Sequence, residues 1–291
     1  MADSRWKYRQ ICKYLLIKPE RMKTMQLLAS DYDGTIKQYS HKEKEPTVEK
    51  RDIEAIRRFR KKGNLFGLVT GRSKGMIDPE LKKYGIETDF LIAQNGSAIW
   101  SKDFQLLHAC EISHETAVEL ADFVKRKKVV CFGAAGLESS GMLYDSRPEI
   151  RDLEREKMKI EKLTEESFRQ MTVISFFIKN ESDEKAELLA KELFQLFDGR
   201  LSFHCNKDVI DVTAYGVSKE TGVRWIEEYY HPDKVAVIGD ALNDLSMIQA
   251  YHGYYITSGC AGLKQYAERG FANMEECLTY MMGETDERKG R

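Results

Sequence analysis

The fold is decided by the stretch Leu27-Leu28-Ala29-Ser30-Asp31-Tyr32-Asp33-Gly34-Thr35. Its short apolar run predicts a buried strand, and the turn-forming sequence Asp-Tyr-Asp-Gly cannot continue that strand. Asp31 and Asp33 therefore follow the carboxyl end of a strand, which is the edge where open α/β sheets bind ligands. Two carboxylates this close raise each other's pKa unless a positive group lies between them. An isolated Asp-x-Asp-Gly is usually a plain turn, so the other strand ends must decide its meaning.

The composition excludes several classes of partner. The 291 residues include 46 basic and 47 acidic side chains, which gives a net charge of −1. This balance provides no general attraction to nucleic acid or to an anionic membrane, and we expect neither as a partner. The cysteines are scattered without a Cys-x-x-Cys pair, and the sequence contains no stretch typical of a signal peptide or a membrane span. We expect a cytoplasmic protein that is a monomer or a weak homodimer.

The first part of the chain alternates predicted strands with predicted helices. Further buried strands are predicted at Leu65–Val69 and Phe90–Ala93, and Asp78-Pro79 is a typical helix start. The same alternation of strands and helices returns late in the chain, where the apolar run Val235–Ile238 predicts another buried strand. This alternation predicts an α/β fold with a doubly wound, Rossmann-like parallel sheet.

The middle of the chain has a different pattern of predicted elements. Residues 99–212 contain short adjacent strands with helices between them, which predicts an α+β domain with a partly antiparallel sheet. We therefore assign residues 25–98 and 213–291 to the core and 99–212 to an inserted domain. Residues 1–24 form an N-terminal extension to which the sequence assigns no role.

Polar residues recur at the ends of the predicted strands and at one helix start. Each of these groups alone has a plain explanation as a turn or as exposed surface, but together they predict one site. The set suits phosphoryl transfer, which needs a nucleophile, a nearby acid/base, carboxylates for a hard cation and donors for the phosphoryl oxygens. Besides Asp31 and Asp33, the candidates are Thr70, Gly71, Arg72, Lys219, Asp240, Asn243 and Asp244.

These motifs resemble those of the haloacid dehalogenase (HAD) superfamily. Asp31-Tyr32-Asp33-Gly34-Thr35 matches its first motif, and Thr70-Gly71-Arg72 matches the second. Gly216-Val217-Ser218-Lys219 matches the third, and Gly239-Asp240-Ala241-Leu242-Asn243-Asp244 the fourth. Asn95-Gly96 resembles the pair that precedes the cap of Cof-type phosphatases, subfamily IIB, whose α/β cap is of the C2B type. The resemblance implies a HAD-like core with the inserted domain as its cap.

The resemblance also implies a role for each candidate residue. Asp31 would be the nucleophile that forms an aspartyl-phosphate, and Asp33 the general acid and base. The implied cofactor is Mg²⁺, and the implied phosphate-binding residues are Thr70, Gly71, Arg72, Lys219 and Asn243. The implied metal ligands are Asp31, the backbone carbonyl of Asp33, and Asp240, with Asp244 in the ligand shell or just behind it.

The expected function is that of a Mg²⁺-dependent phosphatase acting on a small phosphorylated metabolite, such as a sugar phosphate. Two alternatives stay open. A phosphomutase of the phosphomannomutase type shares this core and cap, and it would form an isomer where a phosphatase releases inorganic phosphate. A regulatory protein could bind a phosphorylated metabolite at the same residues without turning it over. In each case the partner is a small phosphorylated molecule.

Overall fold

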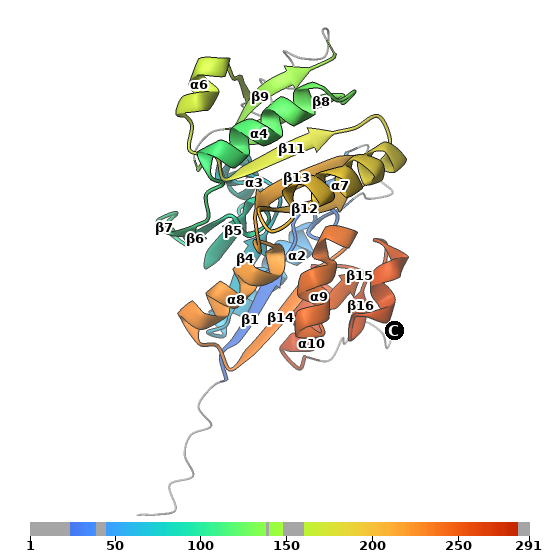
Figure 1. Cartoon of the computed structure of the whole chain (residues 1–291). Helices are drawn as coiled ribbons and strands as arrows, with labels where there is room; N and C mark the ends of the chain where they lie inside the picture. Colours follow the sequence, from blue (N-terminus) through green and yellow to red (C-terminus); the bar gives the residue numbers. More distant parts are fainter. Residues whose placement is uncertain (1–23, 39–44, 138–139, 148–159, 285–291) are drawn as a thin grey trace, which may run out of the picture.

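The computed structural model describes residues 24–38, 45–137, 140–147 and 160–284. They form a larger α/β core and a smaller inserted domain, which lies above the core in Figure 1. The predicted extension, residues 1–24, lies outside the described residues except for Thr24. Among the described residues, no helix is long and apolar enough to cross a membrane.

The core is built on an eight-stranded sheet with the strand order β16-β15-β14-β1-β4-β5-β6-β7. Its first strand, β1 (Gln26–Ser30), lies between β4 (Leu65–Val69) and β14 (Lys234–Gly239) and is parallel to both. The remaining parallel strands are β5 (Phe90–Ala93), β15 (Tyr254–Ile256) and β16 (Arg269–Phe271). The predicted doubly wound parallel sheet is therefore confirmed.

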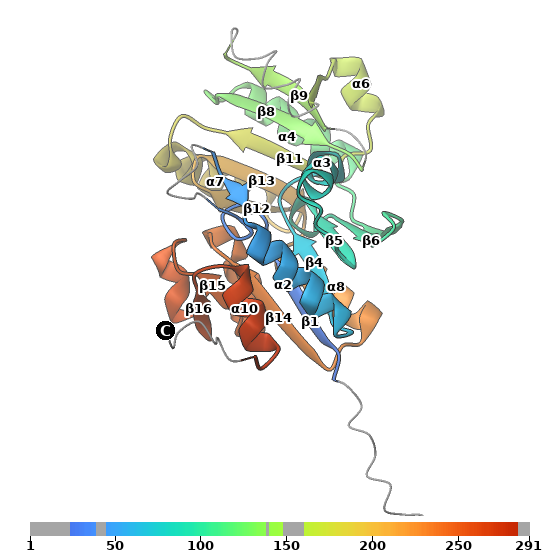
Figure 2. The same cartoon turned by 180° about the vertical axis from the view of Figure 1, so that it is seen from behind.

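Side chains along β1 alternate between two layers of helices, as the two-residue period of a strand requires. Leu28 packs into one hydrophobic cluster with α2 (Lys50–Lys61) and α10 (Met274–Met281). Leu27 and Ala29 pack into another with α8 (Lys219–Tyr230) and α9 (Leu245–Tyr251). Figures 1 and 2 show these helix pairs on opposite faces of the sheet. Because both faces are covered, polar side chains gather where the strands end.

The hairpin β6 (Ala98–Ser101) and β7 (Leu106–Ala109) belongs to the core sheet, with β6 antiparallel to β5. The predicted insert, residues 99–212, therefore begins too early, because it includes a hairpin that belongs to the core. The cause is the tight turn at Gln94–Gly96, in which all three residues have positive φ angles of 51°, 54° and 106°. This turn returns the chain directly alongside β5, and the insert begins after Ala109.

Helix α3 (Lys74–Tyr84) begins earlier than the sequence predicts. The predicted start, Asp78-Pro79, lies inside the helix. Ile77 and Leu81 stand one helical turn apart on either side of the proline, and both are buried in the core. Burial of this pair extends the helix past a residue that usually starts one. The short strands β2 (Lys37–Gln38) and β3 (Thr47–Val48) pair with each other before α2.

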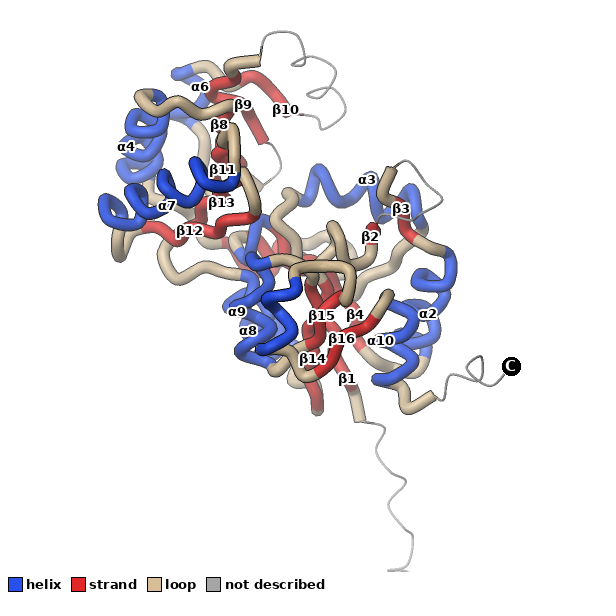
Figure 3. Tube along the Cα trace, turned by 90° about the vertical axis from the view of Figure 1, so that its right-hand side faces the viewer, coloured by secondary structure: helices blue, strands red, loops and turns tan. Residues whose placement is uncertain are grey.

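The inserted domain has a six-stranded, mostly antiparallel sheet with the order β10-β9-β8-β11-β13-β12. Two long helices pack on one face of this sheet, and Figure 3 shows them on the side away from the core. The opposite face is directed toward the carboxyl edge of the core sheet. The elements are α4 (His114–Lys125), β8 (Cys131–Ala135), β9 (Ser140–Asp145), β10 (Ile160–Lys162), α6 (Glu165–Gln170), β11 (Ser175–Lys179), α7 (Asp183–Phe197), β12 (Leu201–Asn206) and β13 (Val209–Ala214).

Candidate active site

A buried lysine joins two carboxylates at the end of β1. Lys219 Nζ donates to Asp31 Oδ1 and to Asp244 Oδ1, both at 2.6 Å. The lysine is only 1% exposed. Ser218 and Thr221 form a capping box that fixes the start of α8, which places Lys219 in the first turn of that helix. The structure therefore brings together three predicted residues that are far apart in the sequence.

A third carboxylate completes an acidic cluster. Carboxylate oxygens of Asp31, Asp240 and Asp244 lie within 4.8 Å of one another. Thr35 Oγ1 donates to Asp240 Oδ1 at 2.9 Å. Gly34 has a φ of +87°, and a Cβ atom on it would lie 2.1 Å from Asp240 Oδ2. The glycine therefore allows the β1 loop to lie directly against Asp240.

The cluster carries more negative than positive charge. Burial raises the pKa of Asp31 well above its usual value; Lys219 opposes that shift, and Asp244 and Asp240 add to it. Burial, followed by the charge of Asp244, raises the pKa of Asp240 to about 6. Burial alone would lower the pKa of Lys219, but the carboxylates of Asp244 and Asp31 outweigh it, so the pKa rises and the amine stays charged. Three carboxylates around one ammonium group leave room for a further cation.

The donor set fits a hard divalent cation. Asp244 uses both oxygens within the protein: Oδ1 accepts from Lys219, and Oδ2 accepts from the N–H groups of Asp240 at 2.9 Å and Ala241 at 3.0 Å. Asp31 Oδ1 accepts from Lys219, Asp240 Oδ1 accepts from Thr35, and the Asp31 and Asp240 carboxyl groups also interact with each other. Mg²⁺ is typically bound by one or two carboxylates together with water and substrate oxygens. The side chain of Asp33 is not part of this cluster.

Asp33 instead pairs with Arg72. Arg72 Nε and Nη2 donate to the two carboxylate oxygens of Asp33, each at 2.6 Å. The Arg72 guanidinium also lies 5.4 Å from the centre of the Tyr32 ring. The Tyr32 hydroxyl donates to Glu80 at 2.7 Å, and Lys37 Nζ donates to the same carboxylate at 2.6 Å. The predicted contact of Arg72 with phosphate therefore stays a prediction, since its partner here is Asp33.

Backbone hydrogen bonds hold the second motif. Thr70 Oγ1 accepts from the Arg72 N–H at 3.1 Å, and the Thr70 carbonyl accepts from the Asn95 N–H at 3.0 Å. Gly71 lies at the tip of this loop, next to the cavity. Asn243 lines the same cavity, and its buried Oδ1 has no hydrogen-bond partner among the described residues.

A cavity of about 410 Å³ separates this edge from the inserted domain. Its floor includes all the predicted phosphate-binding residues except Lys219, which lies beneath Asp31. Its roof was not predicted. In β13 the sequence Ile210-Asp211-Val212 offered a signal, because a carboxylate between two apolar residues of a strand points away from the face that those residues bury. The roof residues include Ser140, Ser175, Phe177, Asn206 and Asp211.

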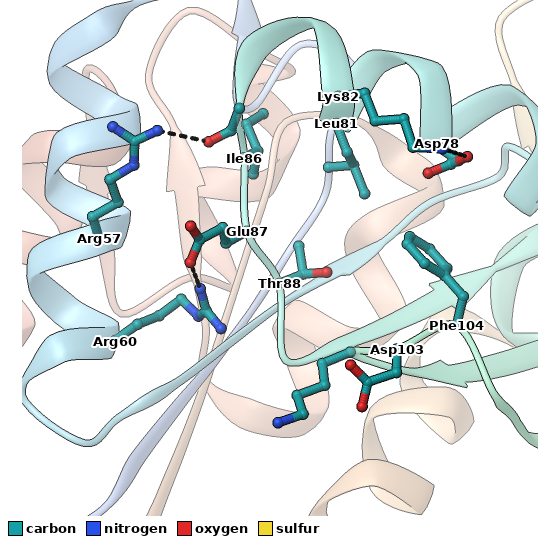
Figure 4. A pocket seen from close by; sticks show the side chains of 12 residues that line it. Arg57, Arg60, Asp78, Leu81, Lys82, Ile86, Glu87, Thr88, Asp103 and Phe104 are labelled. Carbon is teal, nitrogen blue, oxygen red and sulfur yellow. Dashed lines mark hydrogen bonds and ion pairs between the residues drawn. The ribbon is translucent and has the colours of Figure 1, made fainter.

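A second hollow of about 460 Å³ lies on the core between α2, α3 and the β6–β7 hairpin (Figure 4). Its charged side chains are largely satisfied within the protein. Arg60 pairs with Glu87 at 2.6 Å, Lys82 pairs with Asp78 at 2.6 Å, and Arg57 donates to a backbone carbonyl. None of the predicted site residues line it. The candidate active site is therefore the cavity between core and insert.

Comparison with known proteins decides the family. The family described as haloacid dehalogenase-like hydrolase matches residues 28–276, which include every predicted site residue. The chain belongs to this family. The fold gathers the HAD motifs quoted from the sequence at the cavity and in the acidic cluster beneath Asp31.

Individual relatives agree with this assignment. A glucosyl-3-phosphoglycerate/mannosyl-3-phosphoglycerate phosphatase from Persephonella marina is 24% identical over 246 residues, which is 77% of this chain and 81% of that protein. A HAD/COF-like hydrolase from Plasmodium vivax superposes with a TM-score of 0.76 at 21% identity, covering 90% of this chain and 97% of the other. A HAD subclass IIB sugar phosphatase superposes with a TM-score of 0.73 at 21% identity, covering 89% and 99%.

Proposed function

We propose that this HAD-family chain is a Mg²⁺-dependent phosphatase that hydrolyses a small phosphomonoester of the sugar-phosphate type. The observation that carries the proposal is that Asp31 and Asp33 line the same cavity, while a buried lysine and an acidic cluster lie beneath Asp31. The name of the subclass IIB sugar phosphatase supports the substrate class, and the name of the P. marina phosphatase supports hydrolysis of a phosphomonoester.

In the first step, an Asp31 carboxylate oxygen attacks phosphorus as the bond from phosphorus to the ester oxygen breaks. The leaving alkoxide takes a proton from the Asp33 carboxyl group and departs as an alcohol. Lys219, Thr70, Gly71 and Asn243 would neutralise or hydrogen-bond the phosphoryl oxygens. The product on the protein is an aspartyl-phosphate at Asp31.

In the second step, the Asp33 carboxylate takes a proton from a water molecule, whose oxygen attacks the same phosphorus. The bond between phosphorus and Asp31 breaks, which releases inorganic phosphate and restores both aspartates. When Mg²⁺ is bound by Asp31 and Asp240, it would neutralise charge on the phosphoryl group and on the nucleophile. Asp244 would not bind the metal directly; it would accept hydrogen bonds from Lys219 and from the loop that carries Asp240. The insert would cover the cavity and restrict water during both steps.

The test is phosphate release from a panel of phosphomonoesters with Mg²⁺, including p-nitrophenyl phosphate, whose leaving group needs little acid assistance. We expect wild-type turnover, and loss of it in Asp31→Asn. Asp33→Asn should still react with p-nitrophenyl phosphate but stall afterwards, so that intact-protein mass spectrometry finds one added phosphoryl group. Full activity in Asp31→Asn would refute the nucleophile. Isomer formation from a hexose phosphate, with no phosphate release, would establish the phosphomutase alternative.

A further inference from the structure

The roof of the active-site cavity is the face of the insert sheet that carries no helices. Along β11 and β13, Phe176, Ile178, Ile210 and Val212 pack beneath α4 and α7. Asp211 therefore projects to the opposite side, and it lines the cavity together with Asp31. A phosphoryl group held at Asp31 would direct its leaving group toward this roof.

Asp211 lies directly over the phosphate-binding loop. A Cβ atom built on Gly71 would lie 3.1 Å from Asp211 Oδ2. Asn95 Nδ2 donates to the same oxygen at 2.8 Å, and among the described residues this is the one hydrogen bond to the Asp211 carboxylate. The second oxygen, Oδ1, remains for another donor.

The pairing also determines the orientation of Asn95. Because a carboxylate accepts hydrogen bonds and does not donate them, the NH₂ group of Asn95 must face Asp211. The Asn95 Oδ1 is then buried without a hydrogen-bond partner among the described residues, beside the cavity. Asp211 Oδ1 and Asn95 Oδ1 thus offer two acceptors to the leaving group, and the Asn95 NH₂ group uses one of its two N–H donors on Asp211. A ligand with hydroxyl groups satisfies such acceptors, and a ligand with a carboxylate does not.

The charges in the cavity also favour an uncharged leaving group. The described ionisable residues that line it are Asp31, Asp33, Arg72 and Asp211. Arg72, the one cation among them, is already paired with Asp33. Burial raises the pKa of Asp211 to about 6, so the side chain is ionised at pH 7.5. A second anionic group on the leaving group would therefore meet a negative charge in the described part of the roof.

We propose that Asp211, oriented by Asn95, makes this phosphatase selective for leaving groups that are uncharged polyols, and against leaving groups that carry a carboxylate or a second phosphate. The inference rests on the proposed phosphatase function and names the substrate class of the same site. The discrimination is of two kinds: a hydroxyl group of the substrate donates to Asp211, and a second anion is repelled by it.

The test uses pairs of substrates that differ only at the end remote from the phosphate. Glycerol 3-phosphate carries a hydroxymethyl group where 3-phosphoglycerate carries a carboxylate, and sorbitol 6-phosphate and 6-phosphogluconate differ in the same way. We expect wild-type kcat/KM to favour the polyol of each pair by about tenfold or more at pH 7.5. Asp211→Asn should reduce the ratio to about threefold or less, by raising kcat/KM for the carboxylates.

Asp208→Asn is the matched control. It removes the same charge from the same β12–β13 hairpin, but Asp208 pairs with Lys179 and does not line the cavity. Its substrate ratio should equal that of the wild type. Turnover of p-nitrophenyl phosphate, together with Tm, verifies that each variant is folded.

The outcomes are distinguishable. Hydrolysis of p-nitrophenyl phosphate with a substrate ratio near one, or a ratio that Asp211→Asn leaves unchanged, overturns the selectivity and leaves the phosphatase function standing. Failure of the wild type to hydrolyse any phosphomonoester overturns the proposed function, and the selectivity with it.

Discussion

Arg72 holds Asp33 through both carboxylate oxygens, each 2.6 Å from a guanidinium nitrogen. Bidentate pairs of this kind fix the orientation of a carboxylate as well as its position. Because Asp33 is the side chain that we expect to carry the proton, its rotamer must be set before the substrate arrives. A pair this exposed contributes little to the free energy of unfolding. We therefore expect its main effect to be the orientation of the Asp33 carboxylate.

This pair makes Arg72→Lys informative. A lysine keeps the charge but cannot hold both oxygens. We expect kcat for an alkyl phosphate to fall by about tenfold or more, with a smaller loss for p-nitrophenyl phosphate, since that leaving group needs less acid assistance. Steady-state kinetics on the two substrates measure the difference.

The control is Arg60→Lys. Arg60 makes a comparable bidentate pair with Asp89, at 2.9 Å and 2.8 Å, in the second hollow of the core. Its turnover of both substrates should match the wild type. Equal losses for both substrates in Arg72→Lys would contradict an orienting role on the acid.

Replacing Lys219 with Met should affect both stability and turnover. Breaking a buried ion pair by removing one partner typically costs about 3 to 5 kcal/mol, and we expect a loss of that order in urea unfolding. Turnover should fall by about a hundredfold or more, because the amine no longer neutralises phosphoryl oxygens. Adding Asp244→Asn should recover part of the stability without recovering activity; recovery of both would show that Lys219 serves only to balance charge.

Removal of divalent cations tests the acidic cluster. We expect EDTA to abolish phosphate release and Mg²⁺ to restore it. Since a ligand at 100 times its Kd stabilises the native state by about 2.7 kcal/mol, excess Mg²⁺ should also raise Tm in the absence of substrate. Asp240→Asn should weaken this increase in Tm strongly. Activity that survives exhaustive chelation would rule out the metal.

Acid should destabilise the segment that connects the insert to the core after β13, because His204 packs against it. Its Nε2 lies 3.0 Å from Thr213 Oγ1 and 3.1 Å from the Val217 carbonyl oxygen. Burial lowers the pKa of His204 from 6.5 to about 4. The histidine therefore binds a proton more readily in the unfolded chain than in the folded chain. Neutral His204 makes its full contribution to the free energy of unfolding above pH 6.5, and that contribution falls by up to about 3 kcal/mol toward pH 4.

Tm measured at pH 7.5 and pH 5 checks this expectation. His204→Gln should show a smaller acid-induced decrease in Tm than the wild type. His114→Gln, at an exposed histidine in the first turn of α4, is the control and should behave as the wild type does. An unchanged decrease in His204→Gln would assign the acid sensitivity to other groups.

The sequence predicted the candidate site at this edge of the sheet because the signals there are local. Asp31 follows an apolar run directly, and Lys219 follows the Ser218 cap of a helix, so each position could be inferred from its neighbours. Asp211 could be assigned to one face of a strand, but which domain would lie opposite that face depends on how the insert docks. The pairing of Arg72 with Asp33 spans 39 residues and likewise leaves no local pattern. The β6–β7 hairpin falls in the residues that the sequence assigns to the insert, but the positive φ angles at Gln94–Gly96 place it in the core sheet.

The central place of β1 in the core sheet has a consequence for biosynthesis. One neighbour, β4, follows within the next 40 residues, but the other, β14, begins at Lys234. At about 5 to 20 residues per second, the ribosome needs roughly 10 to 40 s to make the intervening chain. Until β14 is made, one side of β1 lacks its partner strand, and the whole insert is synthesised before that partner appears. Substitutions that slow folding of the insert should therefore reduce the yield of protein from the cell even where the purified enzyme works normally.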